Sequence, residues 1–170
     1  IALIKMLRMS DGGRLLVDQV TLNIPIMGQI ASKTSVARFS RTLGTLLTAG
    51  VPILEALNIT RETSGNEVYA RALVSVHDAI REGNSFAAPL RQARIVEPMV
   101  VNMIDVGEET GELDKMLNKV ADTYDEEVKT MTDGLMSLLE PLLTLFLGGA
   151  VGFIVISLFM PLVDLISKLS

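Results

Sequence analysis

The sequence predicts an all-α protein, a compact antiparallel bundle of about six helices followed by a C-terminal transmembrane helix. Apolar residues recur at helical spacing along most of the chain, and no stretch alternates in the manner of a strand. Of the 170 residues 49% are hydrophobic but only 4% are aromatic, which favours helices over sheets. Residues 141–163 contain no charged side chain, which points to a membrane segment.

The first 28 residues are interpreted as the exit of a preceding membrane helix and a connector. The opening IALIKMLRM is apolar and then basic, as at the end of a membrane helix, although an amphipathic soluble helix fits it equally. Pro25 disfavours helical backbone at Ile24, so we expect residues 23–28 to be extended.

A helical-bundle domain is expected over residues 29–135. Its first helix covers residues 32–49 and ends before Gly50, and the second opens at Pro52 and runs to about residue 63. One face of the first helix is apolar, with Val36, Phe39, Leu43, Leu46 and Leu47.

Three further helices follow in the same domain. Residues 67–82 form one with Gly83 as its stop, Ser85 caps a short one, and Pro98 opens another that ends near Gly107. Connections this short imply that neighbouring helices are antiparallel.

After Gly111 one periodic run continues into a transmembrane helix, assigned to residues 136–170. The uncharged stretch of 23 residues would span about 34 Å as a helix, enough to cross a bilayer core. A buried core helix is the alternative, but core helices of this length usually carry a polar face. The apolar stripe of the run consists of Leu113, Met116, Leu117, Val120, Tyr124, Val128, Met131 and Leu135.

Three glycines stand inside the uncharged stretch. The spacing of Gly148 and Gly152 allows a second helix to approach closely, so we take Gly148, Gly149 and Gly152 as a candidate packing face. Contact with lipid alone is the other interpretation.

Charge is divided unevenly along the chain. Residues 1–96 carry eleven Lys or Arg and seven Asp or Glu, a net charge of +4, whereas residues 97–140 carry three Lys and twelve acids, a net charge of −9. Such a domain can dock partners or copies of itself electrostatically, or it can simply present a solvated surface. The sequence has no dense basic stripe interleaved with aromatic residues, so no nucleic-acid partner is expected.

We expect no catalytic residue, no cofactor and no ordinary zinc site, and therefore no enzyme. The chain has no cysteine and one histidine, His77, to which we assign a packing or surface role. The sequence contains neither a glycine-rich phosphate-binding loop ending in Lys-Ser or Lys-Thr nor a G-x-S-x-G elbow.

Two groups of charged residues are candidates for binding a partner. Arg38 and Arg41 lie one turn apart on the polar side of the first helix, a spacing suited to a carboxylate or a lipid phosphate, although a solvated face is the alternative. Glu108 and Glu109 are expected on a tight turn between two glycines, with Glu112 at the start of the next helix.

The second group belongs to an acidic segment, residues 105–114, with five carboxylates in ten residues. We interpret it as a docking surface, from which a force applied by a partner is transmitted along the following helix. The alternatives are that the acids only stabilise the helix start, or that they bind Ca²⁺ or Mg²⁺.

Three stretches resemble signature regions of one family: VARFSRTLGTLLTAGVPILEAL, VGEETGELDKML and LLEPLLTLFLGGAVGFIVISLFMPL. Their order and spacing resemble those of the inner-membrane platform proteins of type II secretion and type IV pilus machines, the protein F or PilC family. The resemblance extends from about Pro25 to the end of the chain. It implies the second half of such a protein, with the exit of one membrane helix, the second cytoplasmic domain and the last membrane helix.

The resemblance implies a non-enzymatic role in the bacterial inner membrane, with the helical domain in the cytoplasm. The implied partners are a hexameric assembly ATPase, pilin or pseudopilin subunits, other inner-membrane platform proteins, the lipid bilayer and further copies in a homo-oligomer. Such proteins are thought to couple the ATPase to filament assembly. A subunit of a membrane transporter or channel is the alternative function, but the span lacks the ionisable residues that mark a translocation path.

Overall fold

The computed structural model describes residue 15, residues 18–22 and residues 24–169, and this part of the chain consists of helices joined by short turns. Its contacts divide the chain into one unit up to Lys129 and a second unit from Thr130. The opening IALIKMLRM, interpreted as the exit of a membrane helix, lies outside the described residues. The boundaries at residues 28 and 135 stay predictions.

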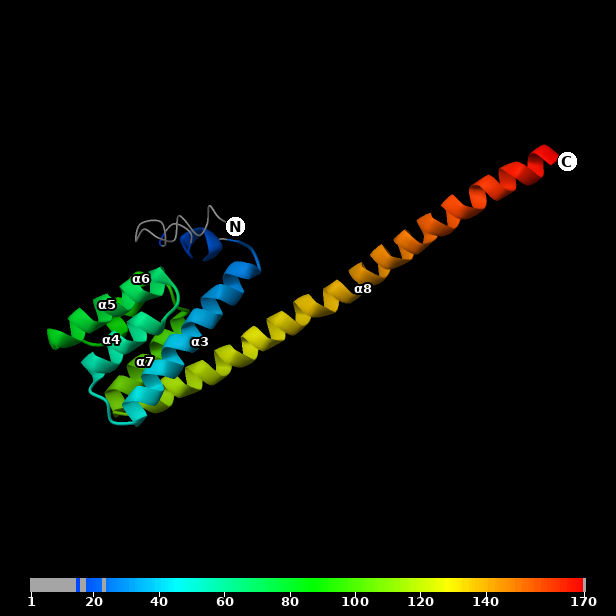
Figure 1. The fold of residues 1–170 in the computed structure, drawn as a ribbon. Helices are drawn as coiled ribbons and strands as arrows, with labels where there is room; N and C mark the ends of the chain where they lie inside the picture. The colour runs from blue at the N-terminus through cyan, green and yellow to red at the C-terminus, as the bar shows by residue number, and fades with distance from the viewer. Residues whose placement is uncertain (1–14, 16–17, 23, 170) are drawn as a thin grey trace. The chain divides into compact units, whose positions relative to one another are not determined.

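The first unit is a bundle of helices that pack in sequence order (Figure 1). α3 packs against α4, α4 against α5, α5 against α6, and α6 against α7. The expected all-helical bundle is confirmed. The helices are α3 (Met27–Thr48), α4 (Ile53–Thr63), α5 (Glu67–Arg81), α6 (Ala87–Ala93), α7 (Pro98–Thr110) and the opening turns of α8 (Leu113–Leu169).

Each of these six helices contributes buried apolar side chains to one cluster. Removal of apolar surface from water is the main stabilising contribution, at roughly 25 cal/mol per Å². The rings of Phe39 and Tyr69 lie 6.2 Å apart, centre to centre, within it. Its largest fully buried members are Tyr69, Phe39, Phe86, Leu43, Leu57, Leu73, Leu90, Ile104 and Leu117.

Residues 24–26 of the connector that was expected to be extended form a bend and a turn instead, and α3 begins at Met27 rather than near residue 32. The Gly28 N–H donates to the Ile24 carbonyl at 2.7 Å. A Cβ atom at Gly28 would lie 2.2 Å from the Leu22 carbonyl oxygen, so this close approach requires glycine.

The second unit is α8 from Thr130 onward. Within the described residues, α8 is the one helix long and apolar enough to cross a membrane, with a mean hydropathy of 2.4 over its most apolar window and no residue of that window buried. Large apolar side chains such as Leu145 and Phe153 are exposed. Length and composition therefore agree with the expected C-terminal membrane helix.

Candidate functional site

Arg41 of α3 is held by two carboxylates of α8. Its Nη2 atom donates to Asp122 Oδ1 at 2.6 Å and to Asp125 Oδ2 at 2.9 Å. These hydrogen bonds, the one to Asp125 foremost, raise the pKa of Arg41. The side chains are 41%, 71% and 59% exposed, so each pair contributes only about 0.2–1 kcal/mol and mainly sets which turn of α8 faces α3.

Lys33, two turns earlier on α3, lies between Glu97 at the start of α7 and Glu127 of α8. Its Nζ atom donates to Glu97 at 3.0 Å and to Glu127 at 2.5 Å. Burial by itself would lower the pKa of Lys33, but the hydrogen bonds to Glu127 and Glu97 outweigh burial and raise it. Lys33 therefore stays charged at neutral pH and joins three helices.

The contacts between α3 and α8 run in opposite order along the two helices. Thr48 Oγ1 donates to Asp114 at 3.2 Å near one end, and Lys33 binds Glu127 near the other. The two helices are therefore antiparallel here, as the bundle prediction requires. We name the ion pairs the α3–α8 clamp, which consists of Lys33, Arg41, Glu97, Asp122, Asp125 and Glu127.

Arg38 differs from Arg41 in its surroundings. Its side chain is exposed and has no ion pair within the described part of the chain. A Cβ atom at Gly65 would lie 2.4 Å from Arg38 Nη1, so this guanidinium covers the turn between α4 and α5. Arg41 thus binds α8, whereas Arg38 covers the turn between α4 and α5. That the two arginines together bind a partner stays a prediction.

The prediction that Glu108 and Glu109 lie on a tight turn is wrong. α7 continues to Thr110, so both residues stand in its last turn, and Gly111 with φ 73° makes the connection to α8. Gly107 lies within α7, and its missing side chain leaves room for α8. A Cβ atom there would lie 2.8 Å from Met116 Cγ.

Glu108 caps the start of α6. Both of its carboxylate oxygens accept a hydrogen bond from the Phe86 N–H at 2.8 Å, and Oε2 also accepts from Ala87 at 3.4 Å. The expected cap Ser85 accepts from the Ala88 N–H at 3.2 Å. Glu108 thereby satisfies backbone donors that a helix start leaves free.

The other carboxylates of residues 105–114 have separate surroundings. Asp105 accepts from Arg91 at 2.8 Å, and Glu112 accepts from Lys115 at 2.5 Å. Glu109 is exposed and has no ion pair among the residues that the structure describes. In those residues no group of three His, Cys, Asp or Glu side chains is placed to hold a metal ion.

His77, for which a packing or surface role was expected, is half-buried on α5. Its side chain is 21% exposed, and its Nδ1 atom lies 3.2 Å from the carboxylate of its neighbour Asp78. No nucleophile accompanies it among the hydrogen bonds of the described residues.

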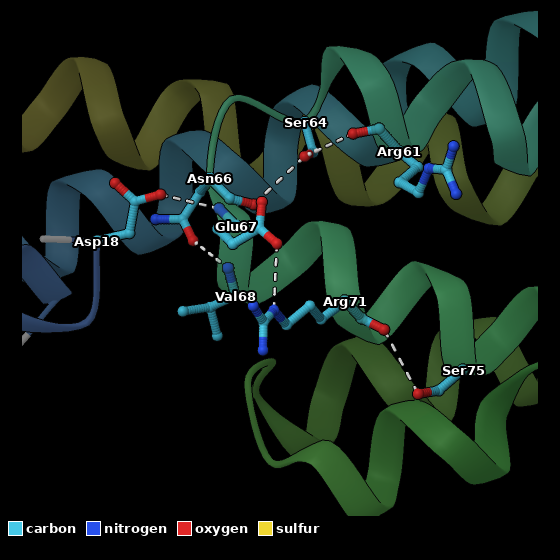
Figure 2. A network of polar contacts seen from close by, with 8 residues as sticks. All are labelled: Asp18, Arg61, Ser64, Asn66, Glu67, Val68, Arg71 and Ser75. Atoms are coloured by element: carbon cyan, nitrogen blue, oxygen red, sulfur yellow. Dashed lines mark hydrogen bonds and ion pairs between the residues drawn. The ribbon is translucent and has the colours of Figure 1, made fainter. Parts of the chain in front are cut away.

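A polar network around the α4–α5 turn was not foreseen (Figure 2). Asp18 Oδ2 accepts from the Glu67 N–H at 2.9 Å, and Asn66 Oδ1 accepts from the Val68 N–H at 2.9 Å. Arg71 binds the Glu67 carboxylate at 3.1 Å, and Asp18 is only 7% exposed. The cap formed by Asn66 could have been predicted, because this residue stands just before a helical run. The contact of Asp18 could not, because its partner lies 49 positions away in the chain.

The three glycines of the candidate span have open surroundings. Cβ atoms built on Gly148, Gly149 and Gly152 meet no atom of the described chain within 4 Å. A second helix or lipid can therefore contact this surface, and the packing role stays a prediction.

The chain is similar to known assembly proteins. It is 46% identical over 153 residues to a type IV pilus assembly protein PilC of Myxococcus xanthus, covering 90% of this chain and 37% of the relative. It is 45% identical over 159 residues to a type IV pilus assembly protein PilC of Thermus thermophilus, covering 93% and 39%. It is 37% identical over 147 residues to a type II secretion system protein F of Aeromonas hydrophila, covering 86% and 38%. The chain spans less than two-fifths of the length of these relatives.

A family profile agrees with these relatives. The profile described as type II secretion system (T2SS), protein F matches residues 39–161, which extend from the core of α3 into the apolar part of α8. This range contains most of the chain, and it includes the second and most of the first and third stretches on which the resemblance rested. The chain belongs to the type II secretion system protein F family.

Proposed function

We propose that the chain is part of an inner-membrane platform protein that couples a cytoplasmic assembly ATPase to the growth of a pilin or pseudopilin filament. The family and the names of the relatives, which are pilus assembly and type II secretion proteins, support this role. The proposal assigns no catalysis to this chain, places the helical bundle in the cytoplasm and anchors α8 in the bacterial inner membrane.

The observation that carries the proposal is the composition of α8. The same helix contributes Leu117, Val120 and Tyr124 to the core of the bundle and, further along, the stretch long enough to cross a membrane. No loop interrupts the helix between these parts. A force on the bundle therefore acts on a membrane segment through a continuous hydrogen-bonded backbone.

The α3–α8 clamp supports the same role. A partner that moves α3 also moves the start of α8, because Lys33 and Arg41 bind carboxylates of that helix. Two carboxylates on each cation oppose sliding of one helix along the other, since sliding separates opposite charges. We propose that this contact carries the displacement.

The predicted docking residues divide into two kinds. Arg41, Glu108 and Glu112 have partners within the bundle, whereas Arg38 and Glu109 have none among the described residues. We propose Arg38 as a contact for the ATPase, because a charge without an internal partner binds an external carboxylate without first losing an ion pair.

Co-purification tests the function. The full-length protein that carries this chain, isolated from native membranes, should retain a hexameric ATPase and pilin-like subunits. The change Arg38→Glu should lower recovery of the ATPase several-fold. Arg81→Glu is the matched control and should not, because Arg81 is equally exposed and without an ion pair in the described chain but lies at the end of α5 and not on α3. Recovery of neither partner, together with substrate flux through vesicles that contain the protein, would indicate a transporter instead.

A further inference from the structure

One face of α7 is exposed and carries two large apolar side chains. Met99 is 63% exposed and Val106 is 50% exposed, and Asn102 lies exposed between them. The spacings of three and four residues place these side chains on one stripe of the helix. The opposite stripe is buried, with Val100, Val101, Ile104 and Gly107. The exposed stripe has no covering element in the described chain.

A positive charge lies at the N-terminal end of this stripe. Arg94, in the connection from α6, has φ 52°, a left-handed conformation that residues with a side chain rarely adopt. Arg94 has no ion pair among the described residues, whereas Arg91 beside it is bound to Asp105. Arg91, Arg94 and Asn102 line a hollow of about 400 Å³ with apolar walls from Val96, Pro98 and Val101.

A negative charge lies at the C-terminal end of the stripe. Glu109 follows Val106 by three residues, is exposed, and lacks an ion pair within the described chain. Its neighbour Glu108 binds the start of α6, and Glu112 is paired with Lys115 at the surface. The stripe therefore carries opposite, uncompensated charges at its two ends and apolar side chains between them.

We propose that a second copy of this chain docks on the stripe, with the two α7 helices antiparallel about a two-fold axis near Asn102. Such a register places Met99 opposite Val106 of the second copy and brings Arg94 toward Glu109 of the second copy. A two-fold axis creates each of these contacts twice, as in other isologous interfaces. Burial of the apolar pair supplies attraction, and the charge pairs set the direction of approach.

Charge complementarity selects this occupant over a lipid surface. An anionic membrane attracted by Arg94 would be repelled by Glu109 at the other end of the stripe. An acidic peptide would match one end and be repelled by the other. The stripe itself, reversed in direction, is complementary at both ends.

The absence of cysteine from the chain allows a direct test by cross-linking. The full chain in detergent micelles, carrying Asn102→Cys, should be converted to a covalent dimer by a short thiol cross-linker. Asn58→Cys is the matched control, an exposed asparagine on α4. Dimerisation through the membrane helix alone would give both variants similar yields, so equal yields overturn the proposal.

Charge reversal tests the register. Added to Asn102→Cys, either Arg94→Glu or Glu109→Arg should lower the dimer yield several-fold, because each homodimer then contains two like-charge contacts. A mixture of the two variants should regain the yield in mixed dimers, in which both contacts are attractive again. Circular dichroism should show unchanged helix content for both. Failure of the mixture to regain dimers, or yields unaffected by either reversal, overturns the proposal and leaves the stripe to another partner.

Discussion

The Lys33 ammonium nitrogen lies 4.8 Å from the centre of the Tyr124 ring while it donates to Glu97 and Glu127. The ring face attracts the cation, and the carboxylates balance its charge. One side chain of α3 thereby joins the start of α7 to α8. This contact lies at the centre of the proposed transmission of movement from α3 to α8.

The first prediction concerns the loss of this cation. Lys33→Met keeps the length of the side chain but leaves Glu97 and Glu127 without a counter-ion. The two carboxylates are 59% and 44% exposed, so water screens part of the repulsion between them. We therefore expect a loss of about 1 kcal/mol in the free energy of unfolding. Denaturant unfolding of the full chain in detergent, followed by circular dichroism, measures it.

Arg71→Met is the matched control for that change. The exposed pair between Arg71 and Glu67 spans four residues of one helix, and its loss should cost only about 0.3–0.5 kcal/mol. Equal losses for the two variants would show that Lys33 does no more than an ordinary surface lysine.

The second prediction compares the two tyrosines of the chain. The Tyr69 hydroxyl donates to the Ile95 carbonyl at 2.9 Å and shares a hydrogen bond with Ser32 at 2.7 Å. The buried Tyr124 hydroxyl makes no hydrogen bond among the described residues. Tyr69→Phe should therefore lower stability at neutral pH by about 1–2 kcal/mol, and Tyr124→Phe should leave it almost unchanged. The same denaturant unfolding measurement compares the two variants. A larger loss of stability for Tyr124→Phe than for Tyr69→Phe would contradict the geometry.

The third prediction concerns alkaline pH. Burial, assisted by the nearby Glu97 carboxylate, raises the pKa of Tyr124 from 10.0 to about 12. The unfolded chain therefore loses this proton first, and the folded state should lose up to about 1.4 kcal/mol of stability per pH unit from about pH 10 to 12. The raised pKa of Lys33 changes stability in the same direction. The stability that Lys33 contributes is complete below the unfolded pKa of 10.5 and is lost as pH rises through the folded pKa.

Melting temperatures measured between pH 9 and 12 check this dependence. Tyr124→Phe removes one of the titrating groups, so its stability should fall less steeply than that of the unchanged chain. A decline of the same slope in both chains would assign the alkaline sensitivity to other groups.

The fourth prediction separates two adjacent glutamates. Glu108→Ala removes the acceptor for the Phe86 N–H and should cost about 1 kcal/mol, as loss of a helix cap does. Glu109→Ala removes an exposed side chain without an ion pair and should change stability by less than about 0.5 kcal/mol. Thermal melting of both variants compares them. If the two losses match, the cap seen at α6 has no energetic role.

The fifth prediction concerns the candidate span. Replacement of Gly148 or Gly152 by Leu fills a surface on which a second helix would need close approach. We expect a several-fold fall in association measured inside a membrane, with insertion unchanged. Ile154→Leu is the control, since it exchanges one exposed apolar side chain for another. Unchanged association in both glycine variants would assign these residues to lipid contact.

Much of the helical framework follows from the sequence alone, because its signals are local. Gly50, Gly83 and Gly111 all adopt positive φ at helix ends, as expected of the residue type that pays no steric penalty there. Gly107 was misjudged as such a stop, since its role depends on the approach of Met116 from the next helix.

The apolar period also identified part of the core and the candidate membrane segment. Val36, Phe39 and Leu43 are buried as expected, because a helix repeats its faces every 3.6 residues whatever surrounds it. Family signatures were likewise readable, since they are properties of the residue order itself.

Only the tertiary structure decided how the charged residues are partnered. Lys33 and Glu127 are 94 positions apart, and Glu108 reaches an N–H group 22 positions earlier. Backbone hydrogen bonds of a helix join residues four apart and can be predicted from their neighbours. Side-chain pairs form only after burial of the core has chosen which helix faces meet. For that reason the sequence could name Arg41 and Glu108 as polar and exposed candidates, but it could not show that α8 and α6 already hold them.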